Sequence, residues 1–175
     1  MLNKALEFIE DEAPAVAAFA STRRAHRFGD VRDAMADELR VLLRGRKTTA
    51  YGTFSSHARP AAHFLRVYGT RRTVHADFVA RTVVFEDAPK LPSAIGRLLP
   101  AFRTARRYAG EGWHNVVRFA RSDFHFFAGL NRLLRLYYRS ILDGGPPPIS
   151  GREILRVSAA MEEVFRQVAL GQAIR

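Results

Sequence analysis

The stretch Leu136–Gln167, LYYRSILDGGPPPISGREILRVSAAMEEVFRQ, contains the end of one helix, a rigid turn and a second helix. Asp143-Gly144-Gly145 ends the first helix, because glycine accepts the left-handed backbone conformation common at helix C-termini. Pro146 to Pro148 then keep the chain extended. Ser150 is placed to cap the second helix, and Glu153 three residues later completes a capping box. The stretch therefore predicts a helical hairpin.

Both helices of this hairpin are predicted to be amphipathic. We expect the first to begin at Ser122 or Asp123 and to run to Leu142. Its apolar side consists of Phe124, Phe127, Leu130, Leu134, Tyr137, Tyr138 and Ile141, and its basic stripe of Arg132, Arg135 and Arg139. The second helix has an apolar face of Ile154, Val157, Met161, Val164, Phe165 and Val168 at helical spacing. Each helix is thus expected to pack on a sheet through one face.

The chain before the hairpin predicts a short helix followed by strands. Asn3 to Glu12 forms the expected helix, and Arg23 to Asp37 is polar, with loop or short-helix character at Phe28-Gly29-Asp30. Strands are expected at 15–20, 39–43, 48–55, 63–68, 73–79 and 81–85, with apolar and polar residues alternating most clearly at Leu39, Val41 and Leu43. The short connections favour antiparallel pairing. The order of elements predicts an α+β fold, a mostly antiparallel open sheet with helices on one face, as a single domain over residues 1–175.

The segment between the strands and the hairpin is predicted to be irregular. Pro89, Pro92 and Pro100 punctuate a loop and a short helix, and Thr104 to Gly112 is basic and mobile in this interpretation.

Composition restricts the class of protein. The chain has 175 residues, 47% hydrophobic and 26% charged, as expected of a globular protein. It contains no cysteine, which excludes disulfides and thiolate metal sites. Without an apolar run of transmembrane length or a signal-peptide pattern, a cytoplasmic location is the expectation. The net charge of +11 comes almost entirely from arginine and would attract anionic partners.

The hairpin also resembles a known family. Its pattern Y-x-x-I-x-D-G-x-P-P-x-S-x-x-E-x-L-R-V is similar to the C-terminal end of the Gfo/Idh/MocA oxidoreductases. The segments Asp37–Pro60 and His63–Phe78 resemble strands of the same C-terminal domain, except that Arg71-Arg72 stands where the family has Lys-Gly at a hairpin turn. The opening helix resembles the one that follows the family's catalytic histidine.

The resemblance implies a substrate-binding and oligomerisation domain without its nucleotide-binding half. Gly110-Glu111-Gly112 lacks the spacing of a dinucleotide-binding loop, and Lys90 does not stand in the family's E-K-P motif. We therefore expect no catalytic residue, no cofactor and no metal in this chain, although NAD(P) is implied for the complete family enzyme. The implied partners are a second copy, through the open sheet face, and a separate nucleotide-binding domain.

The best candidate site for a substrate is Trp113, His114, Asn115, Arg118 and Asp123, with Arg121 nearby. We expect these residues in a loop that faces a cleft, where they could hydrogen-bond a sugar, a polyol or a carboxylate. The alternative is that Trp113 anchors the core and that the arginines are solvated. Two groups contain residue types that could bind a metal, but neither has a metal-binding spacing: His57, Arg59 and His63, and His114, Asp123 and His125.

Two functions remain open at this point. The first is the substrate-binding domain of a Gfo/Idh/MocA-like NAD(P)-dependent oxidoreductase, inactive alone. The second is a non-enzymatic basic module that uses Arg103, Arg106, Arg107, Arg132, Arg135 and Arg139 to hold an anionic polymer or membrane surface. A further possibility is that Thr73, His75 and Asp77 meet a partner sheet.

Overall fold

The computed structural model describes residues 2–22, 26–28, 31–33, 36–88, 93–124 and 127–173. It divides the chain into two compact units, Met1–Ala58 with Gly144–Arg175 (unit 1) and Arg59–Asp143 (unit 2).

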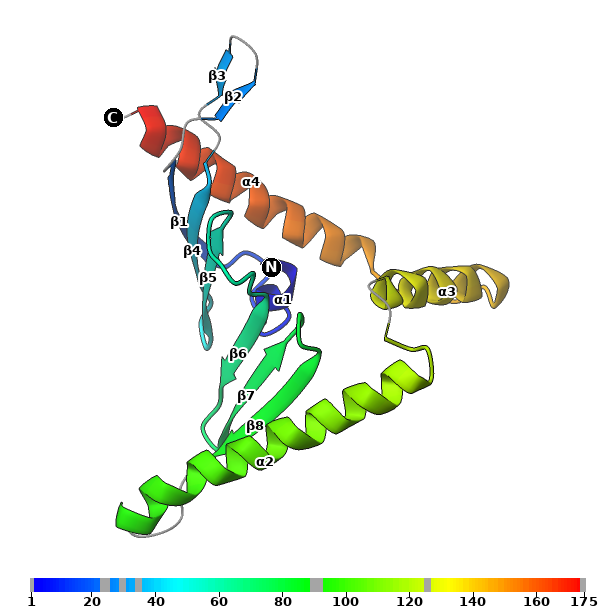
Figure 1. Cartoon of the computed structure of the whole chain (residues 1–175). Coiled ribbons are helices and arrows are strands. Elements are labelled where there is room, and N and C mark those ends of the chain that lie inside the picture. Colours follow the sequence, from blue (N-terminus) through cyan, green and yellow to red (C-terminus); the bar gives the residue numbers. More distant parts are fainter. Residues whose placement is uncertain are drawn as a thin grey trace. The chain divides into compact units, whose positions relative to one another are not determined.

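The elements are α1 (Leu2–Leu6), β1 (Ala15–Ser21), β2 (His26–Phe28), β3 (Val31–Asp33), β4 (Glu38–Arg44), β5 (Thr49–Ser55), β6 (Phe64–Tyr68), β7 (Arg72–Asp77), β8 (Thr82–Asp87), α2 (Ser93–Ala120), α3 (Ala128–Leu142) and α4 (Gly151–Ala173) (Figure 1). The predicted α+β class with antiparallel strands is confirmed. Whether the two units act as one domain stays a prediction.

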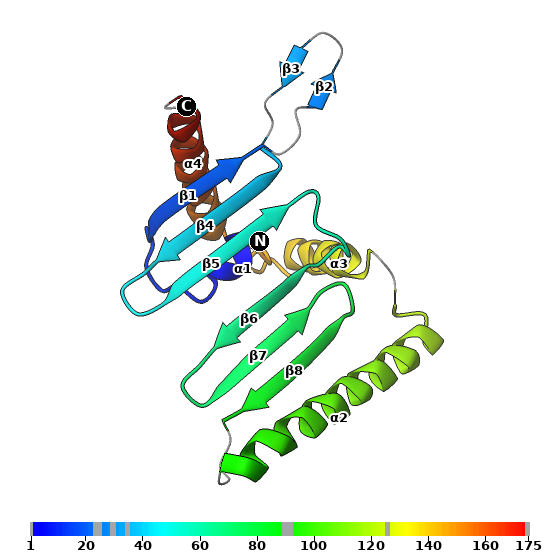
Figure 2. The same ribbon diagram turned by 60° about the vertical axis from the view of Figure 1, so that its left-hand side comes forward.

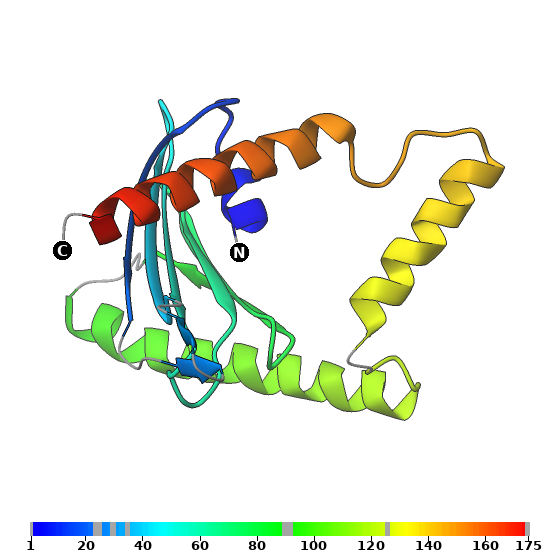
Figure 3. The same ribbon diagram turned by 90° about the horizontal axis from the view of Figure 1, so that it is seen from above.

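Unit 1 contains a three-stranded antiparallel sheet of order β1-β4-β5 and the β2-β3 hairpin. One face of the three-stranded sheet forms the core. Val41 and Leu43 of β4 are 2% and 1% exposed there and pack with Leu6 and Ile9 near the N-terminus and with Ala160 and Val164 of α4. Figure 3 shows α4 crossing the strands of this sheet. The residues predicted from alternation in β4 are thus the ones that build the core.

The opposite face of the same sheet is open to solvent. We call its apolar residues Ala17, Phe19, Leu42 and Tyr51 the open face. Ala17, Leu42 and Tyr51 are register partners across β1, β4 and β5, and Leu42 and Tyr51 are 41% and 68% exposed. Because successive side chains of a strand point to opposite sides, Leu43 is buried while its neighbour Leu42 is not.

Helix α4 is fixed at its start and near its end. The Ser150 hydroxyl accepts a hydrogen bond from the Glu153 N–H at 3.2 Å, as the capping prediction requires. Further along, Gln167 accepts from the Ala18 N–H and donates to the Val16 carbonyl, both at 2.8 Å, and so occupies the edge of β1. Gln167 also donates to Glu163, whose pKa is lowered to about 2 chiefly by its hydrogen bonds to Arg166 and then to Gln167.

Arg156 of α4 hydrogen-bonds the main chain of the segment at and after the end of α1. Its guanidinium donates to the main-chain carbonyls of Leu6 (3.1 Å), Ile9 and Asp11 (2.7 Å). The expected helix from Asn3 to Glu12 is therefore wrong beyond Leu6. The carbonyls at and beyond the end of a helix lack intrahelical partners, and Arg156 supplies donors to these three; the Leu6 carbonyl also accepts from the Ile9 N–H at 3.1 Å.

Unit 2 contains a second three-stranded antiparallel sheet, of order β6-β7-β8, with α2 along β8 (Figure 2). Val84 is 1% exposed. Side chains of α2 hydrogen-bond the outer edge of β8: Glu111 accepts from the Val83 N–H at 3.1 Å, and Arg107 donates to the Phe85 carbonyl. Such covering prevents an edge strand from pairing with another chain. His75 of β7 also faces α2, since its Nδ1 lies 3.0 Å from the Tyr108 hydroxyl, so this residue is not free to meet a partner sheet.

The prediction of a short helix and a mobile segment between residues 89 and 112 is wrong. Helix α2 is continuous over 28 residues and contains Pro100. A proline inside a helix costs about 3 kcal/mol, which is why the sequence suggested a break. The bonds from Arg107, Glu111 and Asn115 of α2 to unit 2's strands and turn offset this cost. Pro89, Lys90 and Pro92 lie outside the described residues.

The predicted helix start at Ser122 or Asp123 is also wrong. Ser122 has a left-handed backbone (φ 55°) and ends α2, with the Ser122 N–H bonded to the Phe119 carbonyl and the Asp123 N–H to the Arg118 carbonyl. This is a Schellman motif with serine where glycine is usual. Helix α3 begins only at Ala128. At its other end, Gly144 has φ 61°, as predicted for the turn before the prolines.

Other sequence expectations need smaller corrections. Phe28 ends strand β2 and is not in a loop or helix, while Gly29 and Asp30 lie outside the described residues. The Gly69–Arg72 turn closes with a Gly69 N–H to Arg72 carbonyl bond and uses no positive φ, so arginine at position 71 carries no strain. None of the described helices is both long and apolar enough to cross a membrane.

The apolar sides of α3 and α4 differ from the prediction. In α4, Val164 is buried and Val157 and Val168 are half-buried, but Ile154, Met161 and Phe165 are exposed. In α3 no residue is buried, although the helix has the expected apolar side opposite its three arginines. The apolar side of α3 and part of that of α4 are therefore exposed in this chain.

Candidate functional site

A cavity of about 270 Å³ lies within unit 2, where β8 meets α2. It is open to solvent. Its lining combines an apolar part, Val83 and Phe85 of β8, with polar side chains from β7 and α2. The lining residues are Arg72, Val83, Phe85, Arg107, Gly110, Glu111 and His114. A concave surface with a few convergent polar groups is the usual form of a small-molecule site.

Two arginines at this cavity share one carboxylate. Arg72 Nε lies 3.0 Å from Asp87 Oδ1, and an Arg107 guanidinium nitrogen lies 2.6 Å from Asp87 Oδ2. The hydrogen bond from Arg107, and then the charge of Arg72, hold the pKa of Asp87 below its ordinary value. The Arg72 guanidinium also lies over the Phe85 ring, 5.6 Å from its centroid. Both cations are therefore held in place by groups of unit 2.

Glu111 and His114 add a carboxylate and an imidazole. Glu111 Oε2 accepts from the Val83 N–H, and Glu111 Oε1 lies 3.8 Å from His114 Nδ1, one helical turn away. The Glu111 side chain is 24% exposed and that of His114 is 70% exposed. Because the strand holds one carboxylate oxygen, the other is oriented toward the histidine and remains an acceptor at the cavity.

The charges at the cavity balance. Arg72 and Arg107 contribute two positive charges, and Asp87 and Glu111 contribute two negative charges. An anionic ligand would meet the Glu111 carboxylate and two arginines already paired. A neutral ligand with several hydroxyl groups would find an acceptor in Glu111, donors in the arginines, and an apolar surface in Phe85 for its C–H groups. The arrangement suits a sugar or polyol better than a carboxylate or phosphate.

The structure brings only one of the predicted site residues to this cavity. His114 lines it, but Trp113, Asn115 and Arg118 lie on the helix α2 and not in a loop, so the expected loop is wrong. Trp113 is 69% exposed, which also contradicts its interpretation as a core anchor. Asn115 donates to the Ala80 carbonyl at 2.7 Å and accepts from Arg118 at 3.3 Å.

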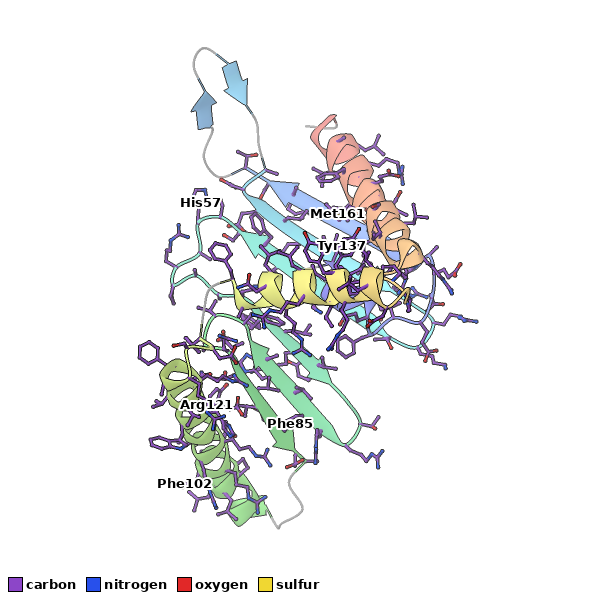
Figure 4. The ribbon with its side chains drawn as sticks, turned by 90° about the vertical axis from the view of Figure 1, so that its right-hand side faces the viewer. His57, Phe85, Phe102, Arg121, Tyr137 and Met161 are labelled. Carbon is purple, nitrogen blue, oxygen red and sulfur yellow. The ribbon has the colours of Figure 1, made fainter. Side chains whose placement is uncertain are left out.

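The remaining predicted residues serve the end of α2. The Asp123 carbonyl accepts from Arg81, whose guanidinium also lies over the Phe124 ring, 4.8 Å from its centroid. Arg121 follows the last residue of α2 and is exposed (Figure 4). Asn115, Arg118 and Asp123 therefore join α2 to the turn between β7 and β8, and their role toward a substrate stays a prediction.

Neither predicted histidine group forms a metal site among the described residues. His57 Nε2 lies 2.8 Å from Asp37 Oδ2, and His63 packs against Phe78 with ring centroids 4.7 Å apart. His125 lies outside the described residues. Within the described part of the chain, no three or more histidine, aspartate or glutamate residues gather as metal ligands.

The substrate site predicted from the sequence does not include Arg72, Arg107 or Glu111, and Arg107 is predicted only as part of the basic module. In a helix, Arg107, Glu111 and His114 recur at intervals of four and three residues and share one side. This signal is present in the sequence, but the prolines and glycines of the segment favour an irregular structure and obscure it.

Comparison with known proteins identified no relative of this chain. No family model matches the chain, and no match was found among curated proteins or among solved structures. Function is therefore inferred from the site and from the resemblance in the sequence.

Proposed function

We propose that this chain is the substrate-binding and oligomerisation domain of a Gfo/Idh/MocA-like NAD(P)-dependent oxidoreductase acting on a sugar or polyol. It holds no nucleotide and does not transfer hydride by itself, and it acts together with a separate nucleotide-binding domain in the cytoplasm. The observation that carries the proposal is the charge-balanced cavity at Arg72, Phe85, Arg107 and Glu111, which suits a neutral polyhydroxylated molecule.

The extent of exposed surface supports the need for partners. The open face of Leu42 and Tyr51 in unit 1 is one surface where a second copy would pack, giving a homodimer. Apolar residues that face water in the isolated chain are thereby buried in the assembly.

Ligand binding to the cavity tests this proposal with two matched sugars. D-glucose and D-glucuronate share a ring and differ by one carboxylate. We expect D-glucose to bind in the millimolar range and to shift the amide resonances of Gly110 and His114, while D-glucuronate binds more weakly. The measurement is a two-dimensional NMR titration of the ¹⁵N-labelled chain.

Variants of Glu111 sharpen this test. In Glu111→Gln the side chain still accepts from Val83 but loses its charge, so affinity for D-glucose should fall by about fivefold, since charge-assisted hydrogen bonds are roughly twice as strong as neutral ones. Affinity for D-glucuronate should rise, because a repulsion is removed. Glu86→Gln, an exposed position of β8 that does not line the cavity, is the control. Tighter binding of D-glucuronate by the unmodified chain, or no shift with either sugar, would refute the assignment.

A basic binding module is the second candidate function, favoured by α3. This helix carries Arg132, Arg135 and Arg139, contains no acidic residue, and has no buried residue. If the module binds an anionic surface, the chain should sediment with phosphatidylserine vesicles at low salt, and the bound fraction should fall steeply as NaCl rises. The Arg132→Gln, Arg135→Gln and Arg139→Gln triple variant should then lose binding. Absence of binding at low salt eliminates this function.

A further inference from the structure

Helix α2 has an apolar side that is distinct from the side that hydrogen-bonds β8 through Arg107 and Glu111. We call it the outer stripe of α2, and it comprises Leu98, Phe102, Ala105, Ala109, Trp113, Val116 and Ala120. Its large members are strongly exposed: Leu98 is 62%, Phe102 66%, Trp113 69% and Val116 54% exposed. In Figure 4, Phe102 extends from the side of α2 away from the strands. A helix that already packs on a sheet does not need this stripe for its own fold.

The spacing of the outer stripe is that of a helix–helix contact. Its residues follow one another at intervals of four or three, as the core positions of paired helices do. At about 1.5 Å per residue the stripe is roughly 33 Å long. A surface of this kind, straight and continuous, fits another helix along its length and not a small molecule.

The order of large and small residues points to a second copy of the same helix. In an antiparallel pair related by a two-fold axis at Ala109, Trp113 of each copy lies over the small Ala105 of the other. Phe102 then meets Val116, and Leu98 meets Ala120. Trp113 and Leu98 thus face alanine and Phe102 faces the smaller Val116, so that the side chains of the two helices can interdigitate. A self-complementary pattern of this type is what a two-fold interface needs.

We propose that two copies of the chain pair through the outer stripes of α2, antiparallel, with Ala109 at the two-fold axis. This interface is distinct from the open face of unit 1 and does not depend on the proposed oxidoreductase role. Aromatic side chains bury about 150–250 Å² each, so the four large residues supply on the order of 500 Å² per copy. Two copies together reach roughly 1,000 Å², the lower range for a specific interface.

Arginines beside the stripe distinguish this pairing from binding to an anion. Arg103 and Arg106 are exposed on α2 next to the stripe, and both copies carry them. Like charges near an interface repel, and salt screens the repulsion. We therefore expect self-association to strengthen as NaCl is raised, whereas binding to an anionic polymer or membrane weakens under the same change.

Sedimentation velocity of the full chain over a range of concentrations tests the proposal. Trp113→Ala should raise the dimer dissociation constant at least about tenfold, as truncation of a central aromatic anchor does. Phe119→Ala is the matched control, since Phe119 is an equally exposed aromatic residue of α2, 74% accessible, that lies off the stripe. It should leave the dissociation constant unchanged. Equal effects of the two variants would overturn the proposal.

A residue exchange tests the register. Ala105→Trp alone should weaken pairing, because two tryptophans would then face each other. Ala105→Trp combined with Trp113→Ala restores one large residue opposite one small residue and should recover the dimer. A chain that is monomeric throughout, or a dimer lost in Tyr51→Glu of the open face but not in Trp113→Ala, would refute pairing through α2. The second result would instead support the sheet-face dimer of the proposed function.

Discussion

Leu43→Ala is expected to destabilise unit 1 by about 2–5 kcal/mol, the range found when a fully buried leucine is truncated. Leu43 is 1% exposed and is the last residue but one of β4, in the core cluster with Val41, Ile9 and Val164. Truncation removes contacts with the sheet and with α4 at once. Small domains have a total unfolding free energy of about 5–15 kcal/mol, so this substitution would remove a large fraction of the stability of unit 1.

The neighbouring residue supplies the control for this prediction. Leu42 stands on the open face and is 41% exposed, so Leu42→Ala should cost less than about 1 kcal/mol, in keeping with a surface substitution. Urea denaturation followed by far-ultraviolet circular dichroism measures both values. Equal losses from the two substitutions would mean that the sheet is buried on both sides, contrary to the structure.

Arg156→Met is expected to cost about 3 kcal/mol or more, by releasing the segment after α1. The guanidinium donates to the carbonyls of Leu6, Ile9 and Asp11, and methionine of similar length leaves all three without that donor. Hydrogen bonds from charged groups contribute about 1.5–3 kcal/mol each and are not additive. Chemical denaturation gives the loss of stability, and hydrogen exchange of the amides near residues 6–11 locates it.

Arg152→Met removes a positive charge one turn earlier on the same helix but leaves the hydrogen bonds of Arg156 in place. It is therefore the control for the loss of charge in Arg156→Met. Arg152 pairs with Glu12, and both side chains are exposed, 79% and 71%. An exposed ion pair is worth about 0–1 kcal/mol, so this variant should remain close to the unmodified chain. If Arg156→Met lost no more unfolding free energy than Arg152→Met, the hydrogen bonds from Arg156 to the carbonyls of Leu6, Ile9 and Asp11 would not be formed.

Local periodicity predicted the parts of the fold that depend on nearest neighbours. The alternation of Leu39, Val41 and Leu43 identified β4 and its buried face, and the Gly-Pro-Ser sequence before Glu153 identified the start of α4. Both signals act within a few residues, where backbone geometry and side-chain direction are fixed by the sequence itself.

Helix α2 could not be predicted in this way. Its stability depends on bonds between Arg107, Glu111 or Asn115 and residues at least 20 positions away in the sequence. Its end is a Schellman motif built on Ser122, where a sequence pattern expects glycine. An irregular segment has no common side for Arg107, Glu111 and His114, so Arg107 and Glu111 are absent from the predicted site although His114 is in it.

The candidate site was consequently predicted in part. His114 was named and lines the cavity, whereas Trp113 stands on the outer stripe of α2 and Asn115 joins the helix to the strand turn. Adjacent residues in a helix point in directions about 100° apart, so Trp113, His114 and Asn115 could not have formed one site once the segment was helical.

The most direct test of the central claim, that this is a self-associating substrate domain without its own nucleotide site, is its mass in solution. Light scattering should be measured on the purified chain alone and after addition of NAD⁺ or NADH. We predict a multiple of the 19.7 kDa chain mass that neither nucleotide changes. A monomer at every concentration, or a mass that shifts with nucleotide, would contradict the account.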